Sequence, residues 1–200
     1  GMAYPLALTI TSQAGVQVLN VVSDSVLVAK FVIARTIVRL LMQIGIVFNS
    51  AMRPVVSRLI GEGRFTQASQ IVKKGSWLAS GLMMIGLAGI GIFGLGVLDM
   101  LSSGQASISL SELLLIAAHS AVNVLWYTPA TLLYAQNLHA RISLQYMIYS
   151  SFSVLLWVLF VDSLEPVIGV GLMMLLPEML MVVSILYMSV KKRIGFNEAC

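Results

Sequence analysis

Long apolar runs separated by short polar breaks dominate this chain. The runs cover residues 3–22, 26–59, 75–98, 110–137, 141–161 and 167–190. A helix needs about 20 mostly apolar residues to cross the hydrocarbon core of a bilayer, and every run reaches that length. The breaks are too short to hold a soluble domain. The sequence therefore predicts an all-α protein in which residues 1–200 form a single integral membrane bundle of six transmembrane helices.

Composition supports a membrane protein. Of the 200 residues, 58% are hydrophobic and 10% are charged, whereas about 25% of the residues of a soluble domain are charged. The net charge of +4 does not indicate a nucleic-acid partner. The basic residues lie in short loops or inside apolar runs, and no solvated face interleaves them with aromatic residues.

The charges of the breaks separate by sign. One set of alternating breaks carries Arg53, Arg58, Arg64, Lys73, Lys74, Arg141, Lys191, Lys192 and Arg193. The opposite set carries Asp24, Asp99, Asp162 and Glu165. Short basic loops remain in the cytoplasm. We therefore expect a multi-pass protein of the inner (plasma) membrane with both termini of this chain in the cytoplasm.

The second run contains two arginines at membrane depth. Arg35 and Arg39 lie roughly ten and fourteen residues from its external end, near mid-membrane at about 1.5 Å per residue. At about 100° per residue they share one stripe with Gln43, Ser50, Arg53 and Ser57. A central arginine costs at least about 2.5 kcal/mol. Two on one face indicate a water-filled cavity, an acidic partner or an anionic ligand.

A second polar stripe lies on the first run, at Thr9, Gln13, Gln17, Asn20 and Asp24. The spacing of four, four, three and four residues places these side chains on one helical face. Amides donate to sugar hydroxyls and phosphate oxygens, which suits a hydrophilic ligand. They also form ordinary hydrogen bonds between membrane helices, so both interpretations stay open.

Two titratable groups lie inside later runs. His119 shares a face of the fourth run with Asn123 and Tyr127, and it is either a proton-sensitive group or a histidine held by a hydrogen bond. Glu178 follows Pro177 in the sixth run. A buried carboxylate can couple transport to protons, or it can be the counter-ion of Arg35 or Arg39, which we favour. Asp24 is the other acidic candidate for pairing.

No motif indicates catalysis. Zinc-ligand spacing, a nucleophile elbow and a Walker loop are absent from the sequence, so we expect no enzyme activity, no metal site and no cofactor. "GIGIFG" at 89–94 matches a dinucleotide pattern, but that pattern functions only between a strand and a helix. Close helix packing is our interpretation of Gly81, Gly86, Gly89, Gly91, Gly94 and Gly96. Residues 64–74 are expected to form a short interfacial helix or a solvated connector.

Residues 28–74, "VAKFVIARTIVRLLMQIGIVFNSAMRPVVSRLIGEGRFTQASQIVKK", carry a family resemblance. They resemble the eighth membrane span and following loop of polysaccharide flippases, in the multidrug/oligosaccharidyl-lipid/polysaccharide exporter superfamily. The similar positions are Ala34, Arg35, Arg39, Asn49, Pro54 and residues 57–59. The preceding "YPLALTITSQAGVQVLNVVSD" is similar to the seventh span of that family.

The resemblance implies a fold and a cargo. Such flippases have twelve or more helices in two six-helix lobes around a central cavity, and this chain corresponds to the C-terminal lobe. They move a lipid-pyrophosphate-linked oligosaccharide across the bacterial inner membrane by alternating access, as in polysaccharide or O-antigen export. The partners implied are that lipid-linked oligosaccharide, membrane lipids, and a missing N-terminal six-helix lobe or a second copy of this chain.

The resemblance also implies roles for residues. Arg35 and Arg39 bind the pyrophosphate, for which guanidinium is a bidentate match. The glycan path is lined by Gln13, Gln17, Asn20 and Gln43. Independently of the resemblance, the positions of Glu178, Asp24 and His119 in the runs make them the candidates for a coupling or counter-ion role.

Three alternatives remain. A peptidoglycan-precursor flippase carries the same pyrophosphate, and a multidrug exporter of the same superfamily would favour carboxylates over arginines in its cavity. A non-transporting membrane scaffold would have both arginines fully paired and no cavity.

Overall fold

The computed structural model describes residues 3–102 and 108–197, with side chains at 9, 13–43, 45–102, 108–161 and 163–190. The described chain is all-helical, with a short 3₁₀ turn at Val161–Ser163. Its helices are α1 (Ala3–Val22), α2 (Ser25–Gly61), α3 (Phe65–Leu101), α4 (Leu110–Tyr134), α5 (His139–Phe160) and α6 (Pro166–Asn197). Their order follows that of the six apolar runs.

Side chains next to the helix starts explain where several helices begin. The Asp24 carboxylate accepts a hydrogen bond from the Leu27 amide at 2.7 Å and caps α2. Ser109 and Glu112 form a reciprocal capping box at the start of α4. Pro166 opens α6, at the position where a helix tolerates the missing amide hydrogen of proline.

The second and third helices extend well beyond a bilayer. Each has 37 residues, or about 55 Å at 1.5 Å per residue, against a hydrocarbon core of about 30 Å. The segment 64–74 is therefore neither a separate interfacial helix nor a connector, because α3 starts at Phe65. Its Ala68 and Val72 pack against Val56 and Leu59 of α2, and this apolar contact keeps the polar segment helical.

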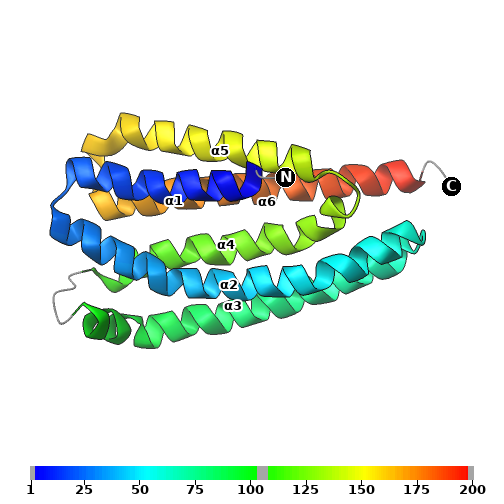
Figure 1. Ribbon diagram of the computed structural model, residues 1–200, viewed down its shortest axis with the longest axis horizontal. Helices are drawn as coiled ribbons and strands as arrows, with labels where there is room; N and C mark the ends of the chain where they lie inside the picture. Colours follow the sequence, from blue (N-terminus) through cyan, green and yellow to red (C-terminus); the bar gives the residue numbers. More distant parts are fainter. Residues whose placement is uncertain (1–2, 103–107, 198–200) are drawn as a thin grey trace.

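The bundle has two halves. α1 packs against α5 and α6, α2 packs against α3 and α4, and α4 and α6 pack against each other and join the halves. Figure 1 shows α1 with α5 along one side and α2 with α3 along the other. Although α1 and α2 are neighbours in sequence, they contact each other much less than they contact their own halves. A space can therefore open between them.

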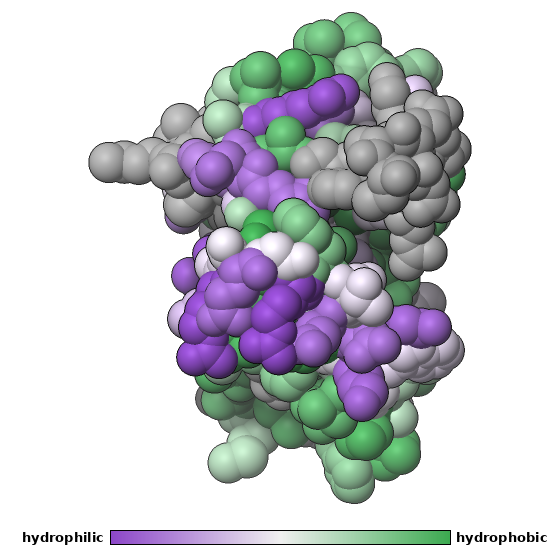
Figure 2. Space-filling view, turned by 90° about the vertical axis from the view of Figure 1, so that its right-hand side faces the viewer, coloured by the Kyte–Doolittle hydropathy of each residue, from purple (hydrophilic) through white to green (hydrophobic). Residues whose placement is uncertain are grey.

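The two ends of the bundle differ in charge. The α2–α3 and α4–α5 turns meet at the right-hand end of Figure 1, where Arg58, Arg64 and Arg141 are exposed. Figure 2 views this end and shows hydrophilic residues gathered over it, with hydrophobic residues around them. The start of α2, the end of α3 and the start of α6 lie at the opposite end, where Asp24, Asp99 and Glu165 are exposed. The sign separation seen along the sequence is thus a separation in space.

The outer faces of α3, α5 and α6 are apolar. Large exposed side chains on them include Trp77, Ile85, Ile92, Leu159 and Val183. Within the described residues, five helices are long and apolar enough to cross a membrane, α2 to α6. Such faces suit contact with lipid, and the fold is compatible with a multi-pass membrane protein.

The glycines of α3 only partly serve close packing. A Cβ at Gly86 would overlap Leu41 of α2, and a Cβ at Gly94 would overlap Leu113 of α4, so these two positions allow helices to approach. No atom lies within 4 Å of a Cβ placed at Gly81, Gly89, Gly91 or Gly96. The packing interpretation of those four was wrong, because they face away from the bundle.

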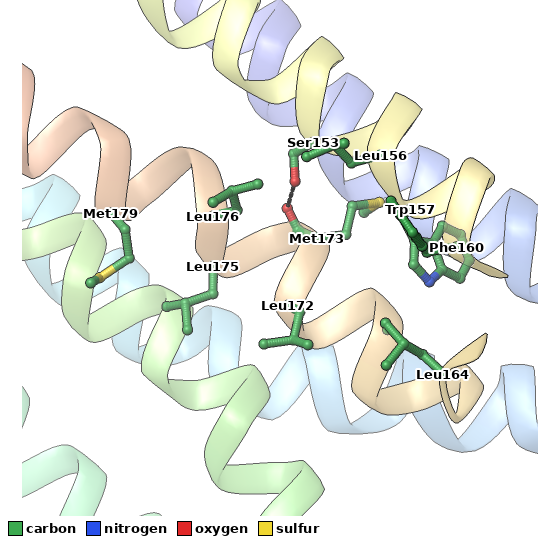
Figure 3. Close-up of a pocket in the computed structure, with 11 residues that line it drawn as sticks. Ser153, Leu156, Trp157, Phe160, Leu164, Leu172, Met173, Leu175, Leu176 and Met179 are labelled. Carbon is green, nitrogen blue, oxygen red and sulfur yellow. Dashed lines mark hydrogen bonds between the residues drawn. The ribbon is translucent and has the colours of Figure 1, made fainter.

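Pro177 lies inside α6 and does not interrupt it. Proline lacks the amide hydrogen that would bond the carbonyl four residues earlier, which here belongs to Met173. The Ser153 hydroxyl of α5 donates to this Met173 oxygen at 2.6 Å, and Figure 3 shows the bond as a dashed line. A side chain from the neighbouring helix thus replaces the missing backbone bond.

We predict that Ser153→Ala destabilises the bundle by about 1–3 kcal/mol, because the buried Met173 carbonyl loses its donor. The midpoint of thermal unfolding in detergent should fall by about 2–4 °C per kcal/mol. Ser151→Ala is the matched control, since Ser151 lies on the same helix and is exposed. Equal midpoints for the two variants would contradict this account of Pro177.

Candidate functional site

A polar cavity of about 240 Å³ lies where α1 and α2 separate. α1 and α2 provide its walls, and α4 and α6 provide its floor. The lining residues are Thr9, Gln13, Arg35, Val38, Arg39, Met42, Gln43, Ile46, His119, Ser120 and Met174. The cavity therefore combines two cationic groups, two amides and a histidine with apolar side chains of the helices.

The two arginines of the cavity lie one helical turn apart on α2. Arg35 is half-buried and Arg39 is exposed. They lie ten and fourteen residues beyond Ser25, or about 15 and 21 Å along the helix, and half the thickness of a hydrocarbon core is about 15 Å. The positive charge of Arg39 acts unfavourably on that of Arg35. An anion between the guanidinium groups would relieve this repulsion.

The structure brings together five of the candidate site residues, beside Thr9 of the α1 stripe. Gln13, Arg35, Arg39, Gln43 and His119 all line the cavity. Part of the stripe on α1 and part of the stripe on α2 therefore face a common space.

The other candidates lie elsewhere. Gln17 and Asn20 are exposed on α1 and are not among the residues lining the cavity. Asp24 caps α2 at the acidic end of the bundle. Glu178 lies behind the cavity floor, in contact with His119.

The Glu178 carboxylate is fully buried, and donors from two other helices surround it. Its Oε2 atom accepts hydrogen bonds from the Asn123 amide at 3.0 Å and from the Trp126 indole. Its Oε1 atom accepts one from the Tyr146 hydroxyl at 2.7 Å. These bonds join α6 to α4 and α5 in the middle of the bundle.

His119 connects the carboxylate with the cavity. Its Nδ1 atom lies 3.5 Å from Oε1 of Glu178 and 3.0 Å from the Met174 carbonyl oxygen. The sequence favoured Arg35 or Arg39 as the partner of Glu178. Among the described residues its partners are instead His119 and neutral donors, because the arginines lie on the cavity side of His119.

Sequence reasoning missed two of the groups around Glu178. Trp126 and Tyr146 are fully buried aromatic residues, and nothing in the sequence distinguishes them from ordinary core residues. For Asn123 a signal existed, because it shares a helical face with His119.

A further contact was missed at Arg53. Arg53 donates to the Tyr127 hydroxyl, and its guanidinium carbon lies 5.4 and 5.1 Å from the ring centroids of Tyr127 and Tyr134.

A second cavity, of about 300 Å³, lies between α5 and α6. Figure 3 shows that its labelled side chains are apolar apart from Ser153, whose hydroxyl is bonded to Met173. Trp157 packs against Gly169 there, where a Cβ would overlap the indole. This cavity offers no charged group to a ligand, so the polar cavity between α1 and α2 is the better candidate site.

Within the described part of the chain, no three His, Cys, Asp or Glu residues lie together as they would in a metal site. Fold and site together define an all-helical protein with membrane-compatible helices and a cationic cavity at mid-helix depth. Comparisons with protein-family models, curated proteins and solved structures found no match.

We predict that Glu178→Leu destabilises the protein by about 3–5 kcal/mol, because three buried donors lose their acceptor at once. Glu178→Gln keeps one carbonyl oxygen and should recover part of the loss. Glu165→Leu, an exposed position at the acidic end, is the control. Thermal unfolding in detergent measures all three, and a Glu178→Leu midpoint equal to that of the control would rule out this role.

Proposed function

We propose that this chain is one six-helix lobe of a membrane transporter. Its cargo is a lipid-pyrophosphate-linked oligosaccharide, moved across the bacterial inner membrane by alternating access for polysaccharide or O-antigen export. The single observation that carries the proposal is the cavity in which Arg35 and Arg39 lie side by side near mid-membrane depth.

The chemistry of the cavity fits a pyrophosphate head group. A guanidinium forms two parallel hydrogen bonds to phosphate oxygens, and such charge-assisted bonds are about twice as strong as neutral ones. Gln13 and Gln43 on opposite walls add amide donors and acceptors for phosphate or sugar hydroxyls. A charged arginine at this depth costs at least about 2.5 kcal/mol, and an anionic cargo offsets that cost.

The outward face of α1 and α2 supports a partner lobe. Exposed polar side chains run along both helices, at Thr9, Gln13, Gln17, Asn20, Thr36, Arg39, Gln43 and Ser50. The outer faces of α3, α5 and α6 carry large apolar residues, and α2 also exposes Leu40 and Val47 between its polar positions. Polar faces within a membrane lie against water or protein. The proposed transporter therefore places this face toward an N-terminal six-helix lobe or a second copy of this chain, with aqueous space between the two.

Two alternatives fit the cavity less well. A multidrug exporter for cations needs carboxylates, and none is among the side chains that line the cavity. A scaffold subunit would have no cavity at the arginines.

A peptidoglycan-precursor flippase would bind the same head group, so only a transport assay separates it from the proposed cargo. In each transport reaction the lobe changes no covalent bond and acts without a cofactor.

We predict that Arg35→Ala and Arg39→Ala, in the assembled transporter, each lower surface glycan by about tenfold. Each loses charge-assisted bonds that are worth about 1.5–3 kcal/mol apiece. Surface glycan is measured at matched protein level in cells that depend on the transporter. Arg58→Ala is the control, because Arg58 is exposed on the α2–α3 hairpin outside the cavity.

Unchanged glycan in both cavity variants would refute the transport role assigned to the arginines. Restoration of growth in cells that lack their peptidoglycan-precursor flippase would instead favour that cargo.

The proposal also places the basic end of the bundle in the cytoplasm, and cysteine labelling tests this. In a Cys200→Ser background, Ser163→Cys lies at the acidic end and Gln67→Cys at the basic end, both exposed. An impermeant maleimide should label only Ser163→Cys in intact spheroplasts, and both variants after permeabilisation. The reverse pattern would invert the orientation.

A further inference from the structure

One titratable group borders both the cavity and the buried carboxylate. His119 is 5% exposed and lines the cavity with Arg35 and Arg39. On its other side, Nδ1 lies 3.5 Å from the Glu178 carboxylate. Nothing in the arginine–pyrophosphate contact itself requires a histidine at this position.

The hydrogen bond to Met174 fixes the tautomer of His119. A carbonyl oxygen only accepts, so the Nδ1 atom at 3.0 Å from the Met174 oxygen carries a hydrogen. In the neutral ring the second nitrogen, Nε2, is then the atom that can take up a proton. A protonated His119 would carry its positive charge with Nδ1 3.5 Å from Oε1 of Glu178.

The charges around His119 oppose one another. Arg35 and Arg39 of α2 face it across the cavity, and Glu178 of α6 faces it from behind, with Tyr146 of α5 bonded to the same carboxylate. α1 contributes the neutral Thr9 and Gln13. The charged side chains on the described part of α3 lie toward its ends, at Lys73, Lys74 and Asp99. His119 therefore lies between two arginines on the cavity side and one carboxylate behind it.

We infer that His119 is a proton-binding group of the anion cavity, with Glu178 as its fixed counter-charge. An anion that neutralises the arginines removes the repulsion acting on His119, while the attraction of Glu178 remains. Anion binding therefore takes up a proton at His119. By thermodynamic reciprocity, a proton on His119 strengthens anion binding by the same factor.

The inference rests on the proposed function, because it assumes an anion in this cavity. It predicts that anion affinity increases as the pH falls through the range in which histidine titrates, about pH 5–8. For one linked proton the increase is at most about tenfold per pH unit. The other histidine, His139, is exposed at the start of α5 and should have no such effect.

Calorimetry of the detergent-solubilised chain tests this, with sulfate as the probe because it remains a dianion across that range. Each titration is run in two buffers of different ionisation enthalpy, which yields the number of protons taken up per anion bound. We expect an uptake approaching one proton for the wild type and for His139→Asn, the matched control. His119→Asn keeps an amide donor for the Met174 oxygen and should show no uptake and a flat pH profile.

The outcomes separate the two proposals. Sulfate binding without proton uptake in the wild type, or with equal uptake in His119→Asn, would overturn the inference and leave the anion site standing. If neither sulfate nor inorganic pyrophosphate binds at any pH, the proposed function fails, and the inference fails with it. The wild-type measurement decides between these results even if His119→Asn does not fold.

Discussion

The cost of withdrawing polar and charged groups from water governs this structure, and the bundle meets it in two opposite ways. Glu178 is withdrawn completely from solvent, and hydrogen-bond donors from α4 and α5 replace its hydration. Arg35 and Arg39 border a cavity instead, where water or an anion can solvate them. The first arrangement holds helices together, whereas the second keeps a space open between them.

The buried carboxylate and the arginine cavity depend on each other, because α4 and α6 contribute to both. The bonds to Glu178 join α6 to α4 and α5, and the Ser153 hydroxyl ties α5 to the Met173 carbonyl that Pro177 leaves without its helical donor. Three helices thus form a tightly connected unit, while α1 and α2 pack on different parts of it. The walls of the cavity can separate because the floor does not rely on contact between them. A weakened floor would disturb the cavity even if both arginines were intact.

Features within one helix were readable from the sequence, and contacts between helices were not. Apolar length and helical period indicated the order of the helices, and spacing along α2 placed Arg35, Arg39 and Gln43 on one face. The polar composition of 64–74 hid the true start of α3, because Ala68 and Val72 become a helical face only against α2. The partner of Glu178 was misjudged for a similar reason. Counting charges favours an arginine, but neutral donors such as Trp126 satisfy a carboxylate and carry no charge to count.

Under the proposed anion site, charge balance across the cavity floor accounts for a histidine between the two kinds of site. Counting Glu178 as an ionised carboxylate, the formal charges of Arg35, Arg39 and Glu178 sum to one net positive charge when His119 is neutral. A bound dianion changes the sum to one net negative charge, and a proton on His119 returns it to zero. Low-dielectric surroundings favour neutral combinations of groups, and His119 is the side chain in contact with both the carboxylate and the cavity. A permanently charged lysine there would add to the arginine repulsion in the empty site, and a neutral residue would leave the filled site unbalanced.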